Sequence, residues 1–240
     1  MSAFDIKNLI LQKISGCILQ LPRDIYVLHF LIHVDEERKD IPTLSLCFNT
    51  LSELTNGEID FSEECWNVAC WKTDEIPIIG NNFRITAEAM ETTKMLTEWF
   101  AVNDCDYSKI EKDPLDEYYE YTTGYRVLSE MIQSITPEVK TMLRNINGFN
   151  VICLVGDFSF VPSDIERINS MNGDEIMPFV RYYQECSAVS NCHNIESGDF
   201  IHDFVQGAIE ALEKIKVDYA SEQDKSDQLS KAIEDFKNLL

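Results

Sequence analysis

Most of the local motifs that mark a catalytic site are missing from this sequence. No serine stands in a Gly-x-Ser-x-Gly turn, and no glycine-rich loop of the phosphate-binding kind occurs. Glycine is itself scarce, at 9 of 240 residues, which leaves few positions for the tight backbone turns that cofactor sites use. These absences disfavour the common nucleophilic hydrolases and nucleotide-binding enzymes, and we predict no cofactor and no catalytic residue.

Positive charge is also scarce. The chain has 20 Lys and Arg against 42 Asp and Glu, so its formal net charge is −22. Such a surface repels nucleic-acid phosphates and anionic lipid headgroups, so we expect neither nucleic acid nor a membrane as partner. It attracts basic proteins and cations, although acidity can also serve solubility alone. The hydrophobic fraction of 45% is ordinary for a folded chain and indicates that the charge lies on a globular surface.

Long apolar runs and a leader segment are absent as well. The longest apolar run, residues 25–34, is interrupted by histidines and is too short to span a bilayer. No basic stretch precedes an apolar block at the start of the sequence, so no secretory leader is expected. Several of the 8 cysteines lie inside apolar runs, where a free thiol packs as a small hydrophobic group. Together these features predict a cytoplasmic protein with reduced cysteines.

The hydrophobic pattern predicts an α+β fold, in which a largely antiparallel sheet packs against several helices and the C-terminus is helical. Strands are expected at residues 25–34, 43–48, 66–71 and 149–156. Helices are expected at residues 3–15, 86–100, 125–134, 136–147 and 163–172. We expect one domain over residues 1–220, with an amphipathic helix at 221–240 that packs on it. Its apolar stripe could alternatively contact a second copy of the chain, and the sequence leaves the oligomeric state open.

Metal-ligating residue types gather in one polar segment. They are Cys186, Cys192, His193 and His202. Their spacing is looser than the Cys-x₂₋₄-Cys hooks of structural zinc sites. The sequence therefore leaves two interpretations open, a zinc site and ordinary loop residues, and we predict no metal.

Two other patterns fail as metal sites on inspection. The segment 104–108 begins like an EF-hand loop, but Lys109 and Leu115 occupy the positions that need glycine and glutamate. His29 and His33 share one face of a predicted strand, yet at about 3.3 Å per residue their backbones are roughly 13 Å apart. We expect both histidines to be partly exposed on the sheet.

Acidic and aromatic residues gather in two segments, around 58–71 and 113–121. No Lys or Arg occurs between Asp40 and Trp71. Large rings can anchor a partner and carboxylates can steer a basic one. The candidate partner-binding residues are Glu58, Asp60, Glu63, Glu64, Trp66, Trp71, Asp116, Glu117, Tyr118 and Tyr119. The alternative is a pair of solvated acidic loops beside tryptophans of the core.

A resemblance accompanies these features. Residues 26–71, with the segments Leu-Cys-Phe-Asn-Thr at 46–50 and Trp-Asn-Val-Ala-Cys-Trp at 66–71, resemble a family of bacterial proteins defined only by a shared domain of unknown function. Residues 149–172, a strand followed by a capped helix, fit the same family. In size, acidity and layout the chain is also similar to α+β immunity proteins of bacterial toxin systems, including the SUKH group. Neither resemblance implies catalytic residues.

The sequence thus predicts a non-catalytic binding protein with an acidic surface, of the immunity type that neutralises a basic toxin. The alternative is an enzyme with a carboxylate or thiol site in a cleft between sheet and helices. Cys153 paired with His29 is the thiol version of that site, and a buried core thiol is the competing interpretation of Cys153.

Overall fold

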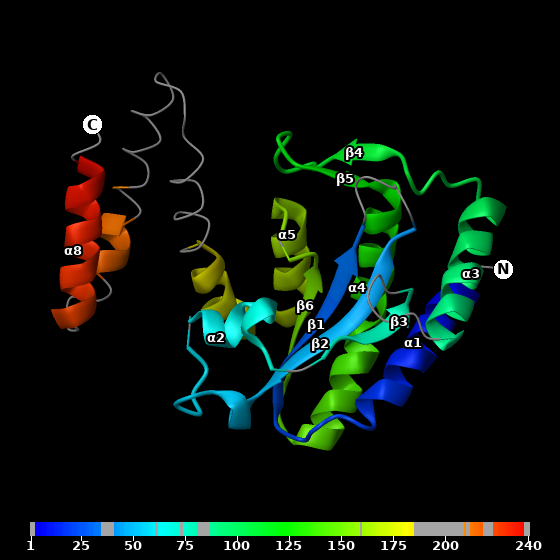
Figure 1. Cartoon of the computed structure of the whole chain (residues 1–240), viewed down its shortest axis with the longest axis horizontal. Helices are drawn as coiled ribbons and strands as arrows, with labels where there is room; N and C mark the ends of the chain where they lie inside the picture. The colour runs from blue at the N-terminus through cyan, green and yellow to red at the C-terminus, as the bar shows by residue number, and fades with distance from the viewer. Residues whose placement is uncertain are drawn as a thin grey trace. The chain divides into compact units, whose positions relative to one another are not determined.

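The structure, a computed structural model, describes residues 3–34, 41–60, 62–72, 74–80, 87–158, 160–184, 209, 212–217 and 223–237. The chain divides into two compact units, Met1–Val180 and Arg181–Leu240. The predicted single domain over residues 1–220, with a packed helix at 221–240, stays a prediction. Figure 1 gives the helices and strands of both units.

A four-stranded mixed sheet forms the centre of the first unit, in the order β3-β2-β1-β6 (Figure 1). Strand β1 (Ile25–His33) pairs antiparallel with β2 (Thr43–Thr50) and parallel with β6 (Ile152–Gly156). Strand β2 also pairs antiparallel with β3 (Ile76–Ile79). The predicted α+β class is confirmed. The parallel pairing of β1 with β6 brings the carboxyl ends of both strands to the same edge of the sheet.

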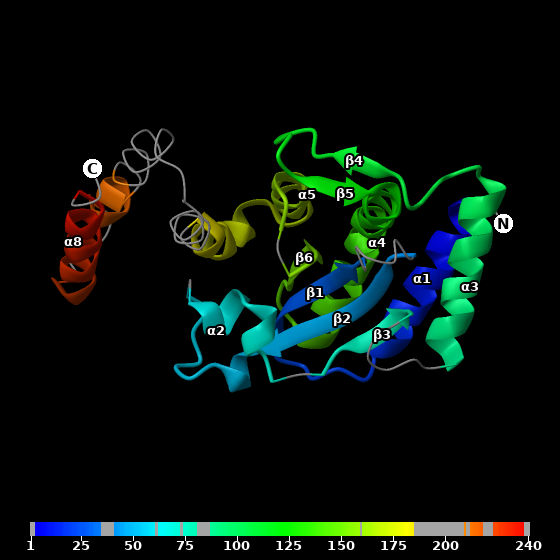
Figure 2. The same ribbon diagram turned by 45° about the horizontal axis from the view of Figure 1, so that its top comes forward.

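Three helices pack together on one side of this sheet, as Figures 1 and 2 show: α1 (Ala3–Ile18), α3 (Ala87–Val102) and α4 (Thr123–Asn147). On α1 an isoleucine recurs every four residues, at Ile6, Ile10, Ile14 and Ile18, and all four are buried. This spacing places them in one stripe along the helix, which explains why the sequence predicts α1 so well.

Asn172 closes the outer edge of β6 at one position. It ends helix α5 (Pro162–Asn172), which packs beside β6. Its Oδ1 accepts the N–H of Cys153 at 2.9 Å, and its Nδ2 donates to the carbonyl of the same residue at 2.7 Å. A single amide thus makes the pair of hydrogen bonds that a neighbouring strand would make at that position.

The segment 66–71 is not a strand, so that prediction is wrong. It contains the end of helix α2 (Glu63–Trp66) and the 3-10 turn η2 (Val68–Cys70). Asn67 stops the chain from extending, because its side chain accepts the N–H of Ala69 and caps the second turn. The alternating pattern here was accidental. Further short turns are η1 (Leu51–Glu53) and η3 (Gly173–Ile176).

The acidic connection before α4 contains a hairpin that was not expected from the sequence. Strands β4 (Ile110–Lys112) and β5 (Glu120–Thr122) pair antiparallel in a sheet of their own. Each has three residues, too few to show a two-residue alternation.

The two helices expected at 125–134 and 136–147 are one helix, α4, with Pro137 inside it. Proline removes one backbone donor from the helix. The hydroxyl of the preceding residue, Thr136, donates to the carbonyl of Ile132 at 2.8 Å. The helix ends at Gly148, as the Asn-Gly pair predicted. Gly148 has a φ of 81°, a left-handed conformation that glycine adopts easily because it has no Cβ atom. Helix α5 begins at Pro162, one residue before the expected start, and Asp164 accepts the N–H of Val161.

The second unit is helical where it is described. It contains the helical residues 181–184, 209 and 212–217, and helix α8 (Gln223–Lys237). Ile209 and Ile233 are buried against each other with Leu212 beside them, and Lys237 forms an ion pair with Glu213 at 3.0 Å. Among the described helices, none has the length and apolar character that a bilayer span requires.

Candidate functional site

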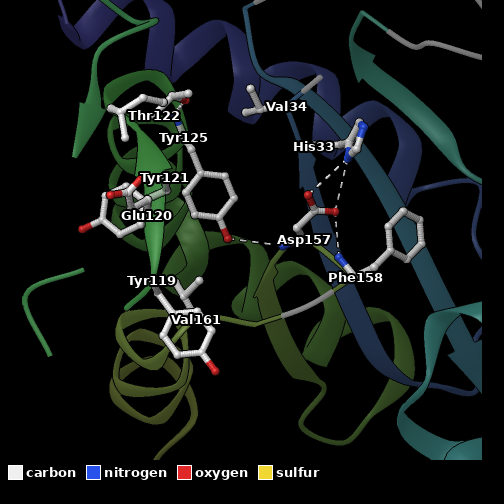
Figure 3. Close-up of a pocket in the computed structure, with 11 residues that line it drawn as sticks. His33, Val34, Tyr119, Glu120, Tyr121, Thr122, Tyr125, Asp157, Phe158 and Val161 are labelled. Atoms are coloured by element: carbon white, nitrogen blue, oxygen red, sulfur yellow. Dashed lines mark hydrogen bonds and ion pairs between the residues drawn. The ribbon is translucent and has the colours of Figure 1, made fainter. Parts of the chain in front are cut away.

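A cavity of about 660 Å³ lies at the edge where β1 and β6 both end (Figure 3). One wall is the β5 side of the hairpin, residues 119–122, and the other is formed by His33 at the end of β1 with Asp157 and Phe158 just after β6. Tyr125, from the first turn of α4, lies between the two walls in Figure 3. The carboxyl ends of neighbouring parallel strands are a common place for ligands to bind in open sheets.

The charged centre of the cavity is the pair of His33 and Asp157. His33 Nδ1 lies 3.1 Å from Asp157 Oδ2, and because a carboxylate only accepts, the ring nitrogen is the donor. Asp157 Oδ1 also accepts the N–H of Phe158 at 2.7 Å. The side chains of His33 and Asp157 are 40% and 31% exposed. Both groups are therefore held in place and still reachable from solvent.

A buried network behind the cavity supports Asp157. The Tyr125 hydroxyl accepts the N–H of Asp157 at 3.2 Å and donates to Asp164 Oδ2 at 2.6 Å. Arg167 Nη1 donates to Asp164 Oδ1 at 2.7 Å. Burial raises the pKa of Asp164 to about 6 although Tyr125 and Arg167 oppose the rise, and burial followed by the Asp164 charge raises the pKa of Tyr125 well above its usual value. At neutral pH Tyr125 is thus a phenol that donates to a carboxylate.

Glycine is required where β6 delivers the chain to Asp157. Gly156 has a φ of +152°, and a Cβ atom on it would lie 2.7 Å from the ring of Phe160 and 3.1 Å from Asp164 Oδ2. Any larger residue would push the strand end away from the network.

A buried carboxylate ties the hairpin to α5. Asp113 Oδ2 accepts the N–H of Ser163 at 3.2 Å, and its Oδ1 accepts the N–H of Leu115 at 2.8 Å. The N–H of Asp113 donates to the carbonyl of Tyr119 at 2.8 Å. Asp113 and Asp164 therefore supply the negative charge that the first turn of a helix prefers. The same bonds hold the hairpin over the cavity.

The candidate residues of the second acidic segment lie on this hairpin. Tyr118 is 86% exposed and Tyr119 is 41% exposed. Asp116 accepts the N–H of Tyr118 at 3.0 Å and shapes the hairpin tip, while Glu117 is exposed. Among these four candidates Tyr119 lines the cavity. The neighbouring lining residues Glu120 and Tyr121 were not among the candidates, although both belong to the same acidic and aromatic segment.

The candidate tryptophans of the first segment lie in the core. Trp66 is 2% exposed and Trp71 is 8% exposed. The Trp66 ring packs edge-on against Tyr26 at 6.0 Å and Phe179 at 5.7 Å, and its indole N–H donates to the carbonyl of Asp60. Large rings contribute most when buried, so neither one is a surface anchor. This corrects the prediction that they present partner-binding surface.

The acids of the first segment are separated from those rings. Glu58, Asp60 and Glu63 are exposed. Glu64 has a local structural role instead, because its Oε1 accepts both the N–H and the hydroxyl of Thr55, at 2.8 and 2.7 Å. The structure thus brings acids and exposed rings together in the second segment and keeps them apart in the first.

The histidine and thiol candidates have separate environments. His29 is buried, and its Nε2 lies 3.2 Å from the carbonyl of Gly156, to which it donates; burial lowers its pKa to about 4. The expectation that it is partly exposed is wrong. Cys153 is also buried, and burial raises its pKa to about 12, so the interpretation of a core thiol is confirmed.

The residues proposed for zinc, Cys186, Cys192, His193 and His202, lie outside the described residues. Within those that are described, no group of His, Cys, Asp and Glu is arranged to hold a metal ion. Comparison with known proteins gives no family: no family model, no curated protein and no solved structure matches this chain.

Proposed function

We propose that this chain is a binding protein for a basic polypeptide, and that the β4–β5 hairpin with the cavity beneath it is the surface that meets the partner. One observation carries the proposal: exposed rings and carboxylates gather around a cavity whose described lining contains no Lys or Arg. Neutralisation of a basic toxin, as in the immunity proteins that the sequence resembles, is one role that such binding would serve.

Exposed apolar side chains support this choice of surface. Ile110, Leu115 and Phe158 are large and exposed, as are Tyr118 and Tyr119. All five belong to the hairpin segment or to the facing wall of the cavity. Soluble proteins seldom expose several such residues together without using them for binding, and tyrosine is enriched among the residues that dominate binding energy.

The charge on the hairpin supports a basic partner. Residues 110–122 contain five acids, Glu111, Asp113, Asp116, Glu117 and Glu120, and one base, Lys112, which donates to the carbonyl of Glu117 at 3.3 Å. With a net charge of −22 on the whole chain, long-range attraction would raise the association rate of a basic partner at low salt.

The test uses a fluorescent peptide of Arg-Gly repeats as a model basic polypeptide. We expect it to bind the wild-type protein, and binding to weaken steeply as salt rises, because screening shortens to about 8 Å at physiological ionic strength. The double substitution Tyr118→Ser/Tyr119→Ser should weaken binding about tenfold or more, since it removes two exposed rings.

A charge-matched pair of variants provides the control. Glu117→Gln/Glu120→Gln removes two charges from the hairpin, and Glu58→Gln/Glu63→Gln removes two charges from the first acidic segment. The hairpin pair should weaken binding clearly more than the distant pair. Equal effects from the two pairs would mean that the peptide responds only to net charge, and the proposed site would be wrong.

One observation favours a second candidate function, an enzyme. His33 is oriented by Asp157 inside a cavity, which is how a general base is commonly held. This candidate predicts hydrolysis of a simple activated ester that depends on the imidazole. Activity that His33→Gln leaves unchanged, or no activity over buffer, counts against it. The thiol version has no support, because Cys153 is buried with a raised pKa.

A further inference from the structure

The cavity contains carboxylate oxygens that can accept more hydrogen bonds than the protein donates to them. Asp157 accepts from His33 and from the N–H of Phe158, whereas a carboxylate has about four acceptor sites. Glu120 lines the same cavity and is exposed, and no described side chain donates a hydrogen bond to its carboxylate. Two carboxylates can therefore take further donors from a ligand.

Aromatic faces stand on both walls beside these carboxylates. Tyr119 and Tyr121 come from the hairpin, and Phe158 comes from the chain after β6 (Figure 3). The Tyr121 ring is fixed by packing on Tyr125, with 5.9 Å between ring centroids. Burial, and next the charge of Asp113, raises the pKa of Tyr121, so its ring is a neutral phenol. Neutral rings beside carboxylates attract a cation over the ring face.

The surrounding charges exclude an anion. Asp113 and Asp164 are buried behind the cavity, and each accepts a backbone N–H at the start of α5. These two carboxylates therefore offset the partial positive charge at the N-terminus of α5. Arg167, the base nearest the network, is bound to Asp164 at 2.7 Å. An anionic ligand would meet four carboxylates and find no base in the described lining.

The shape of the site favours a planar cation. A guanidinium is planar, so it can stack flat on a ring and donate two parallel N–H bonds from two nitrogens to one carboxylate, whereas an ammonium is a compact charge that can do neither. The volume of about 660 Å³ is within the usual range for a ligand site and admits the group together with its aliphatic stem. An arginine side chain can thus enter from a chain that crosses the hairpin.

We infer that the cavity is a receptor for one guanidinium group, the side chain of an arginine of the basic partner. It is held by Asp157 and Glu120, in a cavity whose lining also contains the rings of Tyr119, Tyr121 and Phe158. This inference rests on the proposed function, because the arginine arrives on the polypeptide that the hairpin binds. His33 keeps Asp157 oriented toward the cavity and does not itself take the cation.

The experiment titrates the full chain with N-methylguanidinium and, as a neutral molecule of the same shape, N-methylurea, and follows backbone amide signals by NMR. N-Methylguanidinium should shift the signals of Tyr121, Asp157 and Phe158 in a saturable manner. N-Methylurea should shift them at least about tenfold more weakly, since it lacks the charge.

Single substitutions on one hairpin give the matched control. Glu120→Gln, in the cavity, should weaken N-methylguanidinium binding several-fold, and clearly more than Glu117→Gln, which removes the same charge three residues earlier and outside the lining. Asp157→Asn should weaken it about tenfold and retains an oxygen that can accept the N–H of Phe158. Where Asp157→Asn disturbs the fold, as circular dichroism would reveal, the Glu120 and Glu117 pair still decides.

Failure of this inference is distinct from failure of the proposed function. If N-methylguanidinium shifts no cavity signal while the Arg-Gly peptide still binds through Tyr118 and Tyr119, the guanidinium site is wrong and the binding function stands. If N-methylguanidinium binds as expected but the peptide ignores the hairpin substitutions, the site stands and the proposed function falls. Tighter binding of methylammonium than of N-methylguanidinium overturns the choice of arginine.

Discussion

Protonation of His29 should destabilise the protein as the pH falls from 6.5 to 4. The side chain is fully buried in the centre of β1, stacked on Phe160 at 5.4 Å and edge-on to Trp71 at 6.4 Å between ring centroids. Its Nε2 donates to the carbonyl of Gly156. A second proton would place a charge among these rings, and burial accordingly lowers the pKa from 6.5 to about 4.

The sign and size follow from linkage. A group whose pKa is lowered by folding contributes stability above its unfolded pKa, and that contribution is lost as the pH falls toward the folded pKa. A shift from 6.5 to about 4, at about 1.4 kcal/mol for each pKa unit, corresponds to a loss of about 3 kcal/mol at pH 4. That is a large share of the stability of a typical domain.

Another buried group acts in the opposite direction over much of the same range. The pKa of Asp164 is raised from 3.8 to about 6 by burial, so its contribution is present at low pH and is lost as the pH rises toward 6. The unfolding free energy of the wild-type protein alone therefore does not reveal the contribution of His29, because that of Asp164 changes in the opposite direction. The difference in unfolding free energy between wild type and His29→Gln isolates it, because Gln keeps a donor for Gly156 and does not titrate.

The assay is urea unfolding followed by tryptophan fluorescence at several pH values between 7 and 4. The advantage of wild type over His29→Gln should fall by about 3 kcal/mol across that range. A difference that stays constant with pH, or an NMR titration in which the His29 ring protonates near pH 6.5, would refute the reasoning.

Three further predictions concern the edge and the end of β6. Asn172→Ala leaves the buried N–H and carbonyl of Cys153 without partners. At about 1–3 kcal/mol for each of the two groups, it should lower the unfolding free energy by about 2–6 kcal/mol in urea titrations; a loss below about 1 kcal/mol would contradict it. Gly156→Ala should cost about 1–3 kcal/mol, because its Cβ would meet Phe160, and should weaken N-methylguanidinium binding by displacing Asp157; unchanged stability and binding would contradict that. Cys153 should resist thiol-modifying reagents in the folded protein while the exposed Cys70 reacts, and mass spectrometry that finds both modified at similar rates would show that Cys153 is accessible.

The regular elements of the fold were predictable because their burial is periodic. Helix α1 buries every fourth residue, and strand β1 is a long run of β-branched and aromatic residues. The predictions were wrong where the buried residues do not recur at a regular spacing. Cys65 and Trp66 are adjacent and both buried in α2, so the alternation read into residues 66–71 did not correspond to a strand. The strands of the hairpin, at three residues each, carry no pattern to read.

The candidate site was only half predictable, for a reason that lies in the sheet topology. The cluster of acids and tyrosines at 113–121 is local in sequence and could be identified as a unit. The pairing of His33 with Asp157 joins residues 124 positions apart. It depends on β6 lying parallel beside β1, which no local pattern specifies. The position of Asp157 directly after a fully buried strand was the available signal.

The amide of Asn172 has a consequence for how the protein meets copies of itself. Unpaired strand edges let sheets join into larger aggregates. At Cys153 the outer backbone of β6 is already bonded to Asn172, so an incoming strand would have to displace a side chain anchored also to the carbonyl of Ile168 at 2.8 Å. At the opposite edge, β3 carries Pro77, a residue that sheets tolerate mainly in their edge strands. Loss of Asn172 would expose the outer N–H and carbonyl of Cys153 on β6. It should therefore make the folded protein prone to edge-to-edge association as well as less stable.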